Sequence, residues 1–294
     1  MSGPLPLSGI LFLIFGLSLA ALSGAQMKLL AGTLPVLFII WARFAGYFVI
    51  MVPVALVMRK SRLWPPANPG LQVLRAGCLC GGTLCFLMGA RTLPFADAIA
   101  ILYAYPFLLT VAARLVLGER VRPVVWGGVA TGFIGVLIVM RPGFDGIGTD
   151  ALWVFGAALS VTGLLVVNRM LGPVANPMIT SLYGAGLATL LTAPALLAGL
   201  PHVEIWSYAI LASLAVTAAV SQTAIIVAFA RAPASDLAVF TYAEIVAAVA
   251  IGWAMFGTWP DASAWAGIVL IAASGVFVAR AIRGPIVPRR APRI

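Results

Sequence analysis

Long apolar runs alternate with short polar breaks along the whole chain. They predict ten membrane-spanning helices, over 8–27, 35–58, 71–90, 96–117, 124–140, 151–170, 178–198, 205–230, 236–257 and 262–282. Most runs have about the 20 residues that a helix needs to cross the hydrocarbon of a bilayer, where every backbone polar group must be paired. Gly and Pro mark the connections between the runs, as is typical of turns. The pattern therefore predicts an all-α, polytopic membrane protein.

The fourth apolar run recurs in altered form about half a chain later. The stretch from Leu93 to Glu119 returns as the stretch from Pro233 to Thr258. A shift of 139 residues aligns identical residues in both copies: Pro94 with Pro233, Asp97 with Asp236, Tyr103 with Tyr242, Ala104 with Ala243, Gly118 with Gly257, Trp126 with Trp265, Gly128 with Gly267 and Arg141 with Arg280. One shift that holds over two helices indicates an internal duplication.

The duplication divides the chain into two units of five helices each. We expect a first repeat over 8–141, a second repeat over 151–282 and a basic cytoplasmic tail over 283–294. Because five is an odd number, the second repeat enters the membrane from the opposite side, so the two repeats are inverted. Inverted repeats are common in secondary transporters, which bind their substrate near mid-depth between the two halves.

Composition and charge support a membrane protein and argue against a nucleic-acid partner. Of 294 residues, 63% are hydrophobic and only 9% are charged, against about 25% charged in a soluble domain. The net charge of +10 comes from basic residues between and after the apolar runs, not from a patch interleaved with aromatic residues. With both termini in the cytoplasm, fourteen Lys and Arg residues, Arg75 among them, fall on the inner side and three on the outer side. This bias follows the positive-inside rule.

The sequence offers little for a metal site, a cofactor site or an enzyme. Cys78, Cys80 and Cys85 lie within one apolar run, and His202 is the only histidine. We therefore expect no metal site, no disulfide framework and no cofactor. No phosphate-binding GxxxxGK[ST] loop occurs, so direct use of ATP is not expected. Glu244 has no second carboxylate, His or Cys as a partner for catalysis, which argues against an intramembrane enzyme.

Several motifs of the first repeat resemble the EamA-like unit of the drug/metabolite transporter superfamily. The resemblance covers essentially the whole chain, and it rests on Ala90 to Pro94, Ala96-Asp97-Ala98, Pro106, Leu117 to Arg120, Trp126 to Gly135, and Arg141-Pro142-Gly143. The second copy departs from this pattern, with Gly257-Thr258-Trp259 in place of the Gly-Glu-Arg helix end.

The segment LPFADAIAI is most similar to the branch that includes bacterial uptake carriers for riboflavin and S-adenosylmethionine. The resemblance implies a multi-pass secondary transporter of the bacterial-type inner (plasma) membrane, working by alternating access on a planar vitamin or cofactor-like solute. Other members of the superfamily export amino acids, metallophores or drugs, so an exporter of such small metabolites is the alternative.

Two charges within the predicted spans are candidates for the substrate or coupling site. Glu244 lies about eight residues into its span, where an ionised carboxylate is costly unless it is paired or hydrated. It is either a proton-coupling or substrate-ammonium site, or a structural partner of an arginine. Arg43 lies near Trp41 and Tyr47. Arg43 is suited to pair with Glu244, to bind a substrate carboxylate or phosphate, or to extend to the outer surface.

Aromatic and polar residues supply further candidates. Tyr103, Tyr105 and Tyr242 suit either an aromatic wall for a planar solute or contacts with lipid and neighbouring helices. Gln222 lies within the eighth span, where it either contacts substrate or bonds to another helix. Pro106 is expected to kink the fourth span, as a gating element or as a packing feature.

Two further expectations concern helix ends and the outermost spans. Asp97 and Asp236 follow Pro-containing loops, and we expect them to cap their helices. The fifth and tenth spans are rich in glycine, including Gly128, Gly132, Gly135 and Gly267. The resemblance implies that these two spans lie at the periphery, next to membrane lipid, where they support the other eight or form a homodimer contact.

Overall fold

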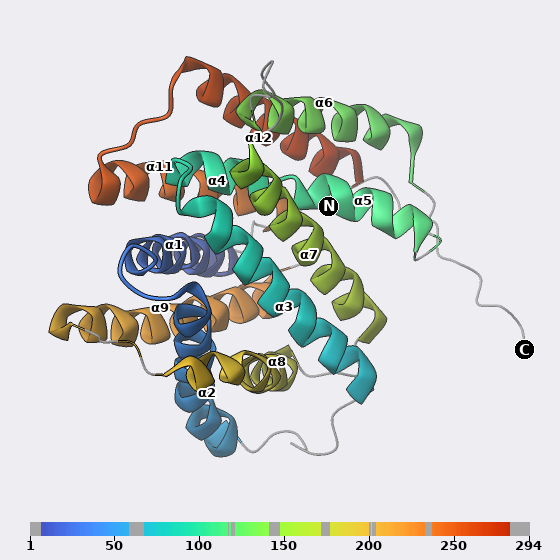
Figure 1. The fold of residues 1–294 in the computed structure, drawn as a ribbon. Helices are drawn as coiled ribbons and strands as arrows, with labels where there is room; N and C mark the ends of the chain where they lie inside the picture. The colour runs from blue at the N-terminus through green and yellow to red at the C-terminus, as the bar shows by residue number, and fades with distance from the viewer. Residues whose placement is uncertain are drawn as a thin grey trace, which may run out of the picture.

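The computed structural model describes residues 7–58, 68–116, 118, 121–140, 148–171, 177–199, 201, 204–232 and 237–282. The regular elements of this part of the chain are all helices (Figure 1): α1 Leu7–Leu30, α2 Val36–Met58, α3 Pro69–Ala90, α4 Phe95–Leu102, α5 Tyr105–Leu115, α6 Pro123–Met140, α7 Thr149–Leu171, α8 Pro177–Thr192, the 3₁₀ helix η2 Ala193–Ala198, α9 Ile205–Arg231, the 3₁₀ helix η3 Ala238–Tyr242, α11 Ala243–Phe256 and α12 Ala262–Ile282.

The ten spans expected from the apolar runs are present as an all-α bundle. Within the described residues, eight helical segments are long and apolar enough to cross a membrane, and two shorter apolar helices cover 240–256 and 262–278. Three spans are interrupted. The fourth consists of α4 and α5, the seventh of α8 and η2, and the ninth of η3 and α11. The sequence predicted a kink in the fourth span but a continuous helix for the ninth.

The packing of the helices follows the duplication in the sequence. The shift of 139 residues relates α1 to α7 and α3 to α9. Accordingly α1 packs along α9, and its equivalent α7 packs along α3. The two remaining long pairs, α2 with α8 and α6 with α12, each join a helix to its own repeat equivalent. A twofold relation between the two halves produces this pattern. The boundaries at 8–141 and 151–282, and the tail at 283–294, stay predictions, and the tail lies outside the described residues.

Glycine explains the close contact of α6 and α12, which lie side by side along one edge of the molecule (Figure 1). A Cβ atom added to Gly135 would be 3.0 Å from the carbonyl oxygen of Gly267, and one added to Gly267 would be 2.8 Å from that of Gly135. The backbones approach closely because neither residue has a side chain, as is common in membrane helix pairs. The homodimer contact proposed for these helices stays a prediction.

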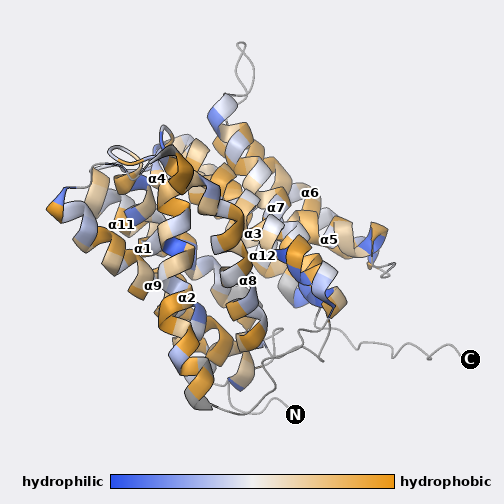
Figure 2. Cartoon of the chain, turned by 60° about the horizontal axis from the view of Figure 1, so that its bottom comes forward, coloured by the Kyte–Doolittle hydropathy of each residue, from blue (hydrophilic) through white to orange (hydrophobic). Residues whose placement is uncertain are grey.

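The outer surface of the bundle is apolar, as a lipid-facing surface requires. Large hydrophobic side chains such as Val49, Leu115, Val246 and Val269 are more than half exposed. Figure 2 shows ribbons that are largely hydrophobic, with many hydrophilic residues near the ends of the helices. A soluble monomer rarely exposes such a continuous apolar surface, so burial in a bilayer is the environment that this fold requires.

Candidate functional site

The fourth and ninth spans are both interrupted near the same repeat-related position. Helix α4 ends at Leu102 and α5 begins at Tyr105, with Pro106 in its first turn. Proline has no N–H group, so the carbonyl of Leu102 cannot receive the usual helical hydrogen bond from residue 106. In the second repeat, the 3₁₀ helix η3 covers Ala238–Tyr242 just before α11. Interrupted helices in corresponding positions of two repeats are typical of transporter binding sites.

Tyr103 joins the two interruptions to each other. Its side chain is fully buried, and its hydroxyl lies 2.5 Å from the backbone oxygen of Thr241 and 2.8 Å from Oε2 of Glu244. The sequence did not identify Tyr103 as the partner of Glu244, because the two residues are 141 positions apart.

The contact between Tyr103, Thr241 and Glu244 has two acceptors and one phenolic proton. A tyrosine hydroxyl donates a single hydrogen bond, so it cannot satisfy the Thr241 carbonyl and an ionised Glu244 at once. If Glu244 carries a proton, its carboxyl group donates to the Tyr103 oxygen, and Tyr103 donates to Thr241. The hydrogen bonds at this contact are therefore complete only with a protonated Glu244.

Aromatic rings surround the contact. The Tyr103 ring lies 5.5 Å from the Tyr105 ring and 5.4 Å from the Tyr242 ring, measured between centroids. Tyr242 fits against α12 because residue 275 is glycine, where an added Cβ would overlap the phenol. Tyr105 and Tyr242 are partly exposed, whereas Tyr103 is not. The structure thus brings together four residues that the sequence singled out, namely Tyr103, Tyr105, Tyr242 and Glu244.

Arg43 and Trp41 lie in a different cluster, on α2. Arg43 is partly buried, and its Nη1 donates to the Thr83 hydroxyl on α3 at 3.3 Å. Its guanidinium also lies 5.5 Å from the Phe44 ring centroid, and Trp41 stacks on Phe38. Among the described residues Arg43 makes no ion pair with Glu244, so the pairing that the sequence allowed is not formed.

Gln222 has no hydrogen bond to the described residues of either cluster. It is partly exposed on α9 and forms no hydrogen bond to another described residue. Its role as a substrate contact stays a prediction.

Arg75 is a residue whose surroundings the sequence did not predict. Its place on the inner side stays a prediction, and the structure buries it within α3, where it is only 6% exposed. Its Nε donates to Oδ1 of Asn168 at 2.8 Å, and its Nη1 donates to the backbone oxygen of Thr180 at 2.9 Å. The signal in the sequence was weak: an arginine a few residues inside the third apolar run, with an asparagine near the end of the sixth.

The capping role expected for Asp97 is also wrong. The N-cap of α4 is Pro94, and Asp97 lies within the first helical turn as a buried side chain. Asp236 lies outside the described residues.

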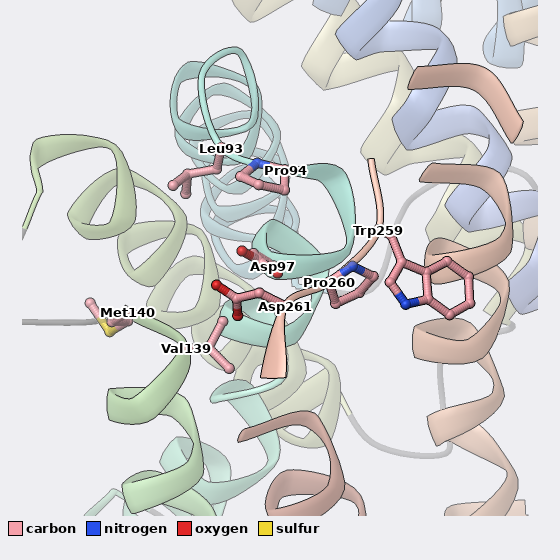
Figure 3. A pocket seen from close by; sticks show the side chains of 8 residues that line it. All are labelled: Leu93, Pro94, Asp97, Val139, Met140, Trp259, Pro260 and Asp261. Carbon is pink, nitrogen blue, oxygen red and sulfur yellow. The ribbon is translucent and has the colours of Figure 1, made fainter. Parts of the chain in front are cut away.

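Asp97 lines a pocket of about 260 Å³ between the α3–α4 connection, α6 and the α11–α12 connection. Figure 3 shows Asp97 and Asp261 next to each other in this pocket. Asp261 also caps α12, since its Oδ1 accepts from the backbone N–H of Ala264 at 2.8 Å. None of the predicted site residues lines this pocket, so the Tyr103–Glu244 contact remains the stronger candidate.

Comparisons with known proteins identify the family. A model described as the EamA-like transporter family matches residues 7–141 and again residues 149–280. The resemblance found in the sequence is thereby confirmed. A solved structure superposes on 95% of this chain and 98% of its own with a TM-score of 0.65, at 17% sequence identity. That likeness concerns the fold alone.

Three curated relatives are transporters of different solutes. A riboflavin transporter of Rhizobium johnstonii is 30% identical over 68% of this chain and 66% of its own length. An S-adenosylmethionine uptake transporter of Rickettsia prowazekii is 22% identical over 92% of both chains. A pseudopaline exporter of Pseudomonas aeruginosa is 24% identical over 94% of this chain and 98% of its own.

Proposed function

Because this chain belongs to the EamA-like transporter family, we propose that it is a secondary carrier for a planar vitamin or cofactor-like solute, of the riboflavin or S-adenosylmethionine type. It takes this solute up across the bacterial inner membrane by alternating access, with both termini in the cytoplasm. The riboflavin transporter and the S-adenosylmethionine uptake transporter among the relatives support this choice of solute. The bias of Lys and Arg toward the inner side supports the orientation of the termini. Transport rather than catalysis is the activity that the family and the names of the relatives indicate.

The observation that carries the mechanism is the hydrogen bond between Tyr103 and Glu244, which joins the two interrupted helices. With Glu244 protonated, all hydrogen bonds of this contact are made. When the proton leaves, one acceptor loses its donor, which costs roughly 1–3 kcal/mol for a buried group. Proton release therefore loosens the contact between the repeats, and proton binding restores it. A carrier that alternates between these two states couples solute movement to the proton gradient.

The rings beside Glu244 supply the surface for a planar solute. Tyr105 and Tyr242 are partly exposed, so they are available to stack on an aromatic ring system. The Tyr105 hydroxyl can orient its polar edges, whereas the Tyr242 hydroxyl lies against Gly275 of α12. Pro106 provides the flexible point at which α5 moves relative to α4. Arg43, Trp41 and Gln222 act as further contacts along the path of the solute.

Flux into proteoliposomes tests this function directly. Purified protein is reconstituted, a pH gradient is imposed, and accumulation of radiolabelled riboflavin and of S-adenosylmethionine is measured against protein-free vesicles. We expect Glu244→Gln to insert and fold but to lose gradient-driven accumulation. Glu204→Gln is the matched control, because Glu204 is an exposed carboxylate at the start of α9. Accumulation at the wild-type rate by Glu244→Gln would refute the coupling role.

Export of metallophores or related metabolites is the second candidate, which the pseudopaline exporter among the relatives supports. The two directions differ in a whole-cell assay. Growth of a riboflavin auxotroph on limiting vitamin requires uptake, whereas loss of a preloaded solute from cells requires export. Rescue of the auxotroph by the intact chain, and no rescue by Glu244→Gln, is the expected outcome.

A further inference from the structure

Arg75 is a buried cation held only by neutral acceptors. Its guanidinium donates to the amide oxygen of Asn168 on α7 and to the backbone carbonyl of Thr180 on α8. Gly184, one turn later on α8, leaves room for it, because an added Cβ would overlap Nη1. Three helices from both repeats therefore hold the guanidinium in one position. Its second terminal nitrogen, Nη2, makes no hydrogen bond to a described residue.

No carboxylate compensates this charge among the residues that the structure describes. An arginine within a membrane is always charged and costs several kcal/mol unless something neutralises it. Two neutral hydrogen bonds satisfy part of its donor capacity but none of its charge. Extension to the water surface is also excluded, because only 6% of Arg75 is exposed. The site has the properties of a receptor for an anion.

Tyr47 provides a second donor at the same junction. Its side chain is 6% exposed on α2, and its hydroxyl lies near Arg75 and Ser181 without a hydrogen bond of normal geometry to a described residue. Buried polar groups in native structures nearly always have partners, so two neighbouring groups with donor capacity left over, Arg75 and Tyr47, indicate a ligand that accepts hydrogen bonds.

The balance of charge within the spans favours an anion as well. Arg43 is partly buried on α2, makes no ion pair to a described residue, and donates to Thr83 on the same helix as Arg75. Glu244 is neutral when its contact with Tyr103 is complete. In that state α2 and α3 each carry one positive charge that no described carboxylate neutralises, and such uncompensated charge attracts ions of the opposite sign.

We infer that Arg75, with the Tyr47 hydroxyl, binds an anionic group of the transported solute, a carboxylate or a phosphate. A guanidinium matches the two oxygens of such a group with parallel N–H donors. The inference rests on the proposed function and narrows its substrate class. A carrier with this site prefers the form of a planar metabolite that bears an anionic group over the neutral form.

Matched pairs of solutes test this preference with the wild-type protein alone. Flavin mononucleotide and riboflavin share one ring system and differ by a phosphate, whereas S-adenosylmethionine and its decarboxylated form differ by a carboxylate. Dissociation constants are measured by titration calorimetry in detergent. We expect tighter binding of the anionic member, by roughly 10-fold or more, in at least one pair. The pair that responds identifies the group, and equal or weaker binding of the anionic member in both pairs overturns the inference.

Substitution of Arg75 locates the effect. Arg75→Gln is expected to weaken binding of the anionic solute by roughly 10- to 100-fold while binding of its neutral partner stays within about 2-fold. Arg75→Lys keeps the charge and retains part of the preference. Arg114→Gln is the control, because it removes an exposed positive charge near the end of α5. A purely structural arginine would weaken both solutes equally, and that result would refute the anion site.

Tyr47→Phe keeps the inference testable if Arg75→Gln does not fold. This change removes only a hydroxyl, and we expect it to reduce the preference for the anionic solute by roughly 3- to 10-fold. An unchanged preference in a folded Tyr47→Phe variant would exclude the hydroxyl from the site.

Inorganic phosphate and acetate separate this inference from the proposed function. In one outcome, no candidate solute is transported, but the wild type melts at a higher temperature in phosphate or acetate than in chloride. If Arg75→Gln or Tyr47→Phe loses this stabilisation, the anion site is supported although the proposed function fails. If riboflavin is transported without any preference for anionic partners, the proposed function stands and the anion site fails. If anionic phosphatidylglycerol reproduces the stabilisation while soluble anions have no effect, the ligand is a lipid headgroup and the solute assignment is wrong.

Discussion

A double-mutant cycle between Tyr103 and Glu244 tests the contact on which the proposed mechanism depends. Tyr103→Phe removes one hydroxyl and leaves the ring, so the centroid distances of 5.5 Å to Tyr105 and 5.4 Å to Tyr242 should persist. The hydroxyl is buried and has two acceptors, at 2.5 Å and 2.8 Å. Its removal leaves the protonated Glu244 carboxyl without its acceptor, whereas the Thr241 carbonyl keeps the backbone N–H of Ala243 as a donor. One buried unsatisfied group costs about 1–3 kcal/mol, and we expect a loss of about that size.

Glu244→Gln should cost much less. The glutamine amide has the same shape as the carboxyl group and supplies an N–H donor to the Tyr103 oxygen, so the hydrogen bonds of the contact remain complete. We expect a change in the free energy of unfolding within about 1 kcal/mol, since one neutral hydrogen-bonded group replaces another of the same shape. Because the amide keeps the interaction, the cycle itself uses Glu244→Leu, which has no hydrogen-bonding group. In that background Tyr103→Phe no longer breaks a hydrogen bond to residue 244, so the two effects do not add.

The free energy of unfolding of the four proteins is measured by denaturant titration in mixed detergent micelles. We expect a coupling energy of about 1–2 kcal/mol, because residues in direct contact typically couple by about 0.5–3 kcal/mol. Tyr208→Phe on α9 is the matched control, since Tyr208 is 56% exposed, and it should change stability by less than about 0.5 kcal/mol. Effects of Tyr103→Phe and Glu244→Leu that add within about 0.3 kcal/mol would show that the two side chains do not interact, and the coupling mechanism would be wrong.

Three further substitutions test the architecture around the site. Gly275→Ala places a Cβ on the Tyr242 phenol and should lower the free energy of unfolding by about 1–3 kcal/mol. Gly127→Ala is the control, because its added Cβ would meet no other atom within 4 Å. It should be neutral or slightly stabilising in the same unfolding titration. Lys28→Met removes two hydrogen bonds, of 2.6 Å and 2.5 Å, to carbonyls at the α3–α4 connection. We expect it to lower the free energy of unfolding by about 1–3 kcal/mol, whereas Lys28→Arg should retain most of the stability. Pro106→Ala restores an N–H group to the interrupted span, so we expect unchanged or higher stability with slower solute flux in proteoliposomes. Wild-type flux in a variant that is also more stable would exclude a gating role for Pro106.

Much of the fold follows from the sequence because the membrane imposes a strict rule on backbone polar groups. An apolar run long enough to cross the hydrocarbon must be helical, so the ten runs predict ten spans, and the structure has helices at each of them. The ends of the spans agree to within a few residues, as with Ala90 at the end of α3 and Met140 at the end of α6. Pro106 marked the interruption of the fourth span. The ninth span contains no proline after Pro233, and the sequence therefore gave no sign of η3.

The candidate site was predictable as a set of residues but not as a set of contacts. Glu244 stands out because an acidic residue within a span is costly, and Tyr103 and Tyr242 stand out because the duplication aligns them. Their hydrogen bond and ring contact depend on how two helices from different repeats turn toward each other. Arg75 was missed for the same reason, since a charge near a span end is buried or solvated depending on which helices cover it.

The sequence alone determines that this chain crosses a membrane, how often, and that its two halves are related, because these properties depend on the local run of apolar residues and on internal similarity. Only the tertiary structure decides which charged groups meet. Most of these helices are apolar around their whole circumference, so the face that each one turns inward is set by close packing at glycines such as Gly135 and Gly267 and not by amphipathicity. That packing puts Glu244 against Tyr103, leaves Arg43 apart from both, and buries Arg75 without a carboxylate partner among the described residues.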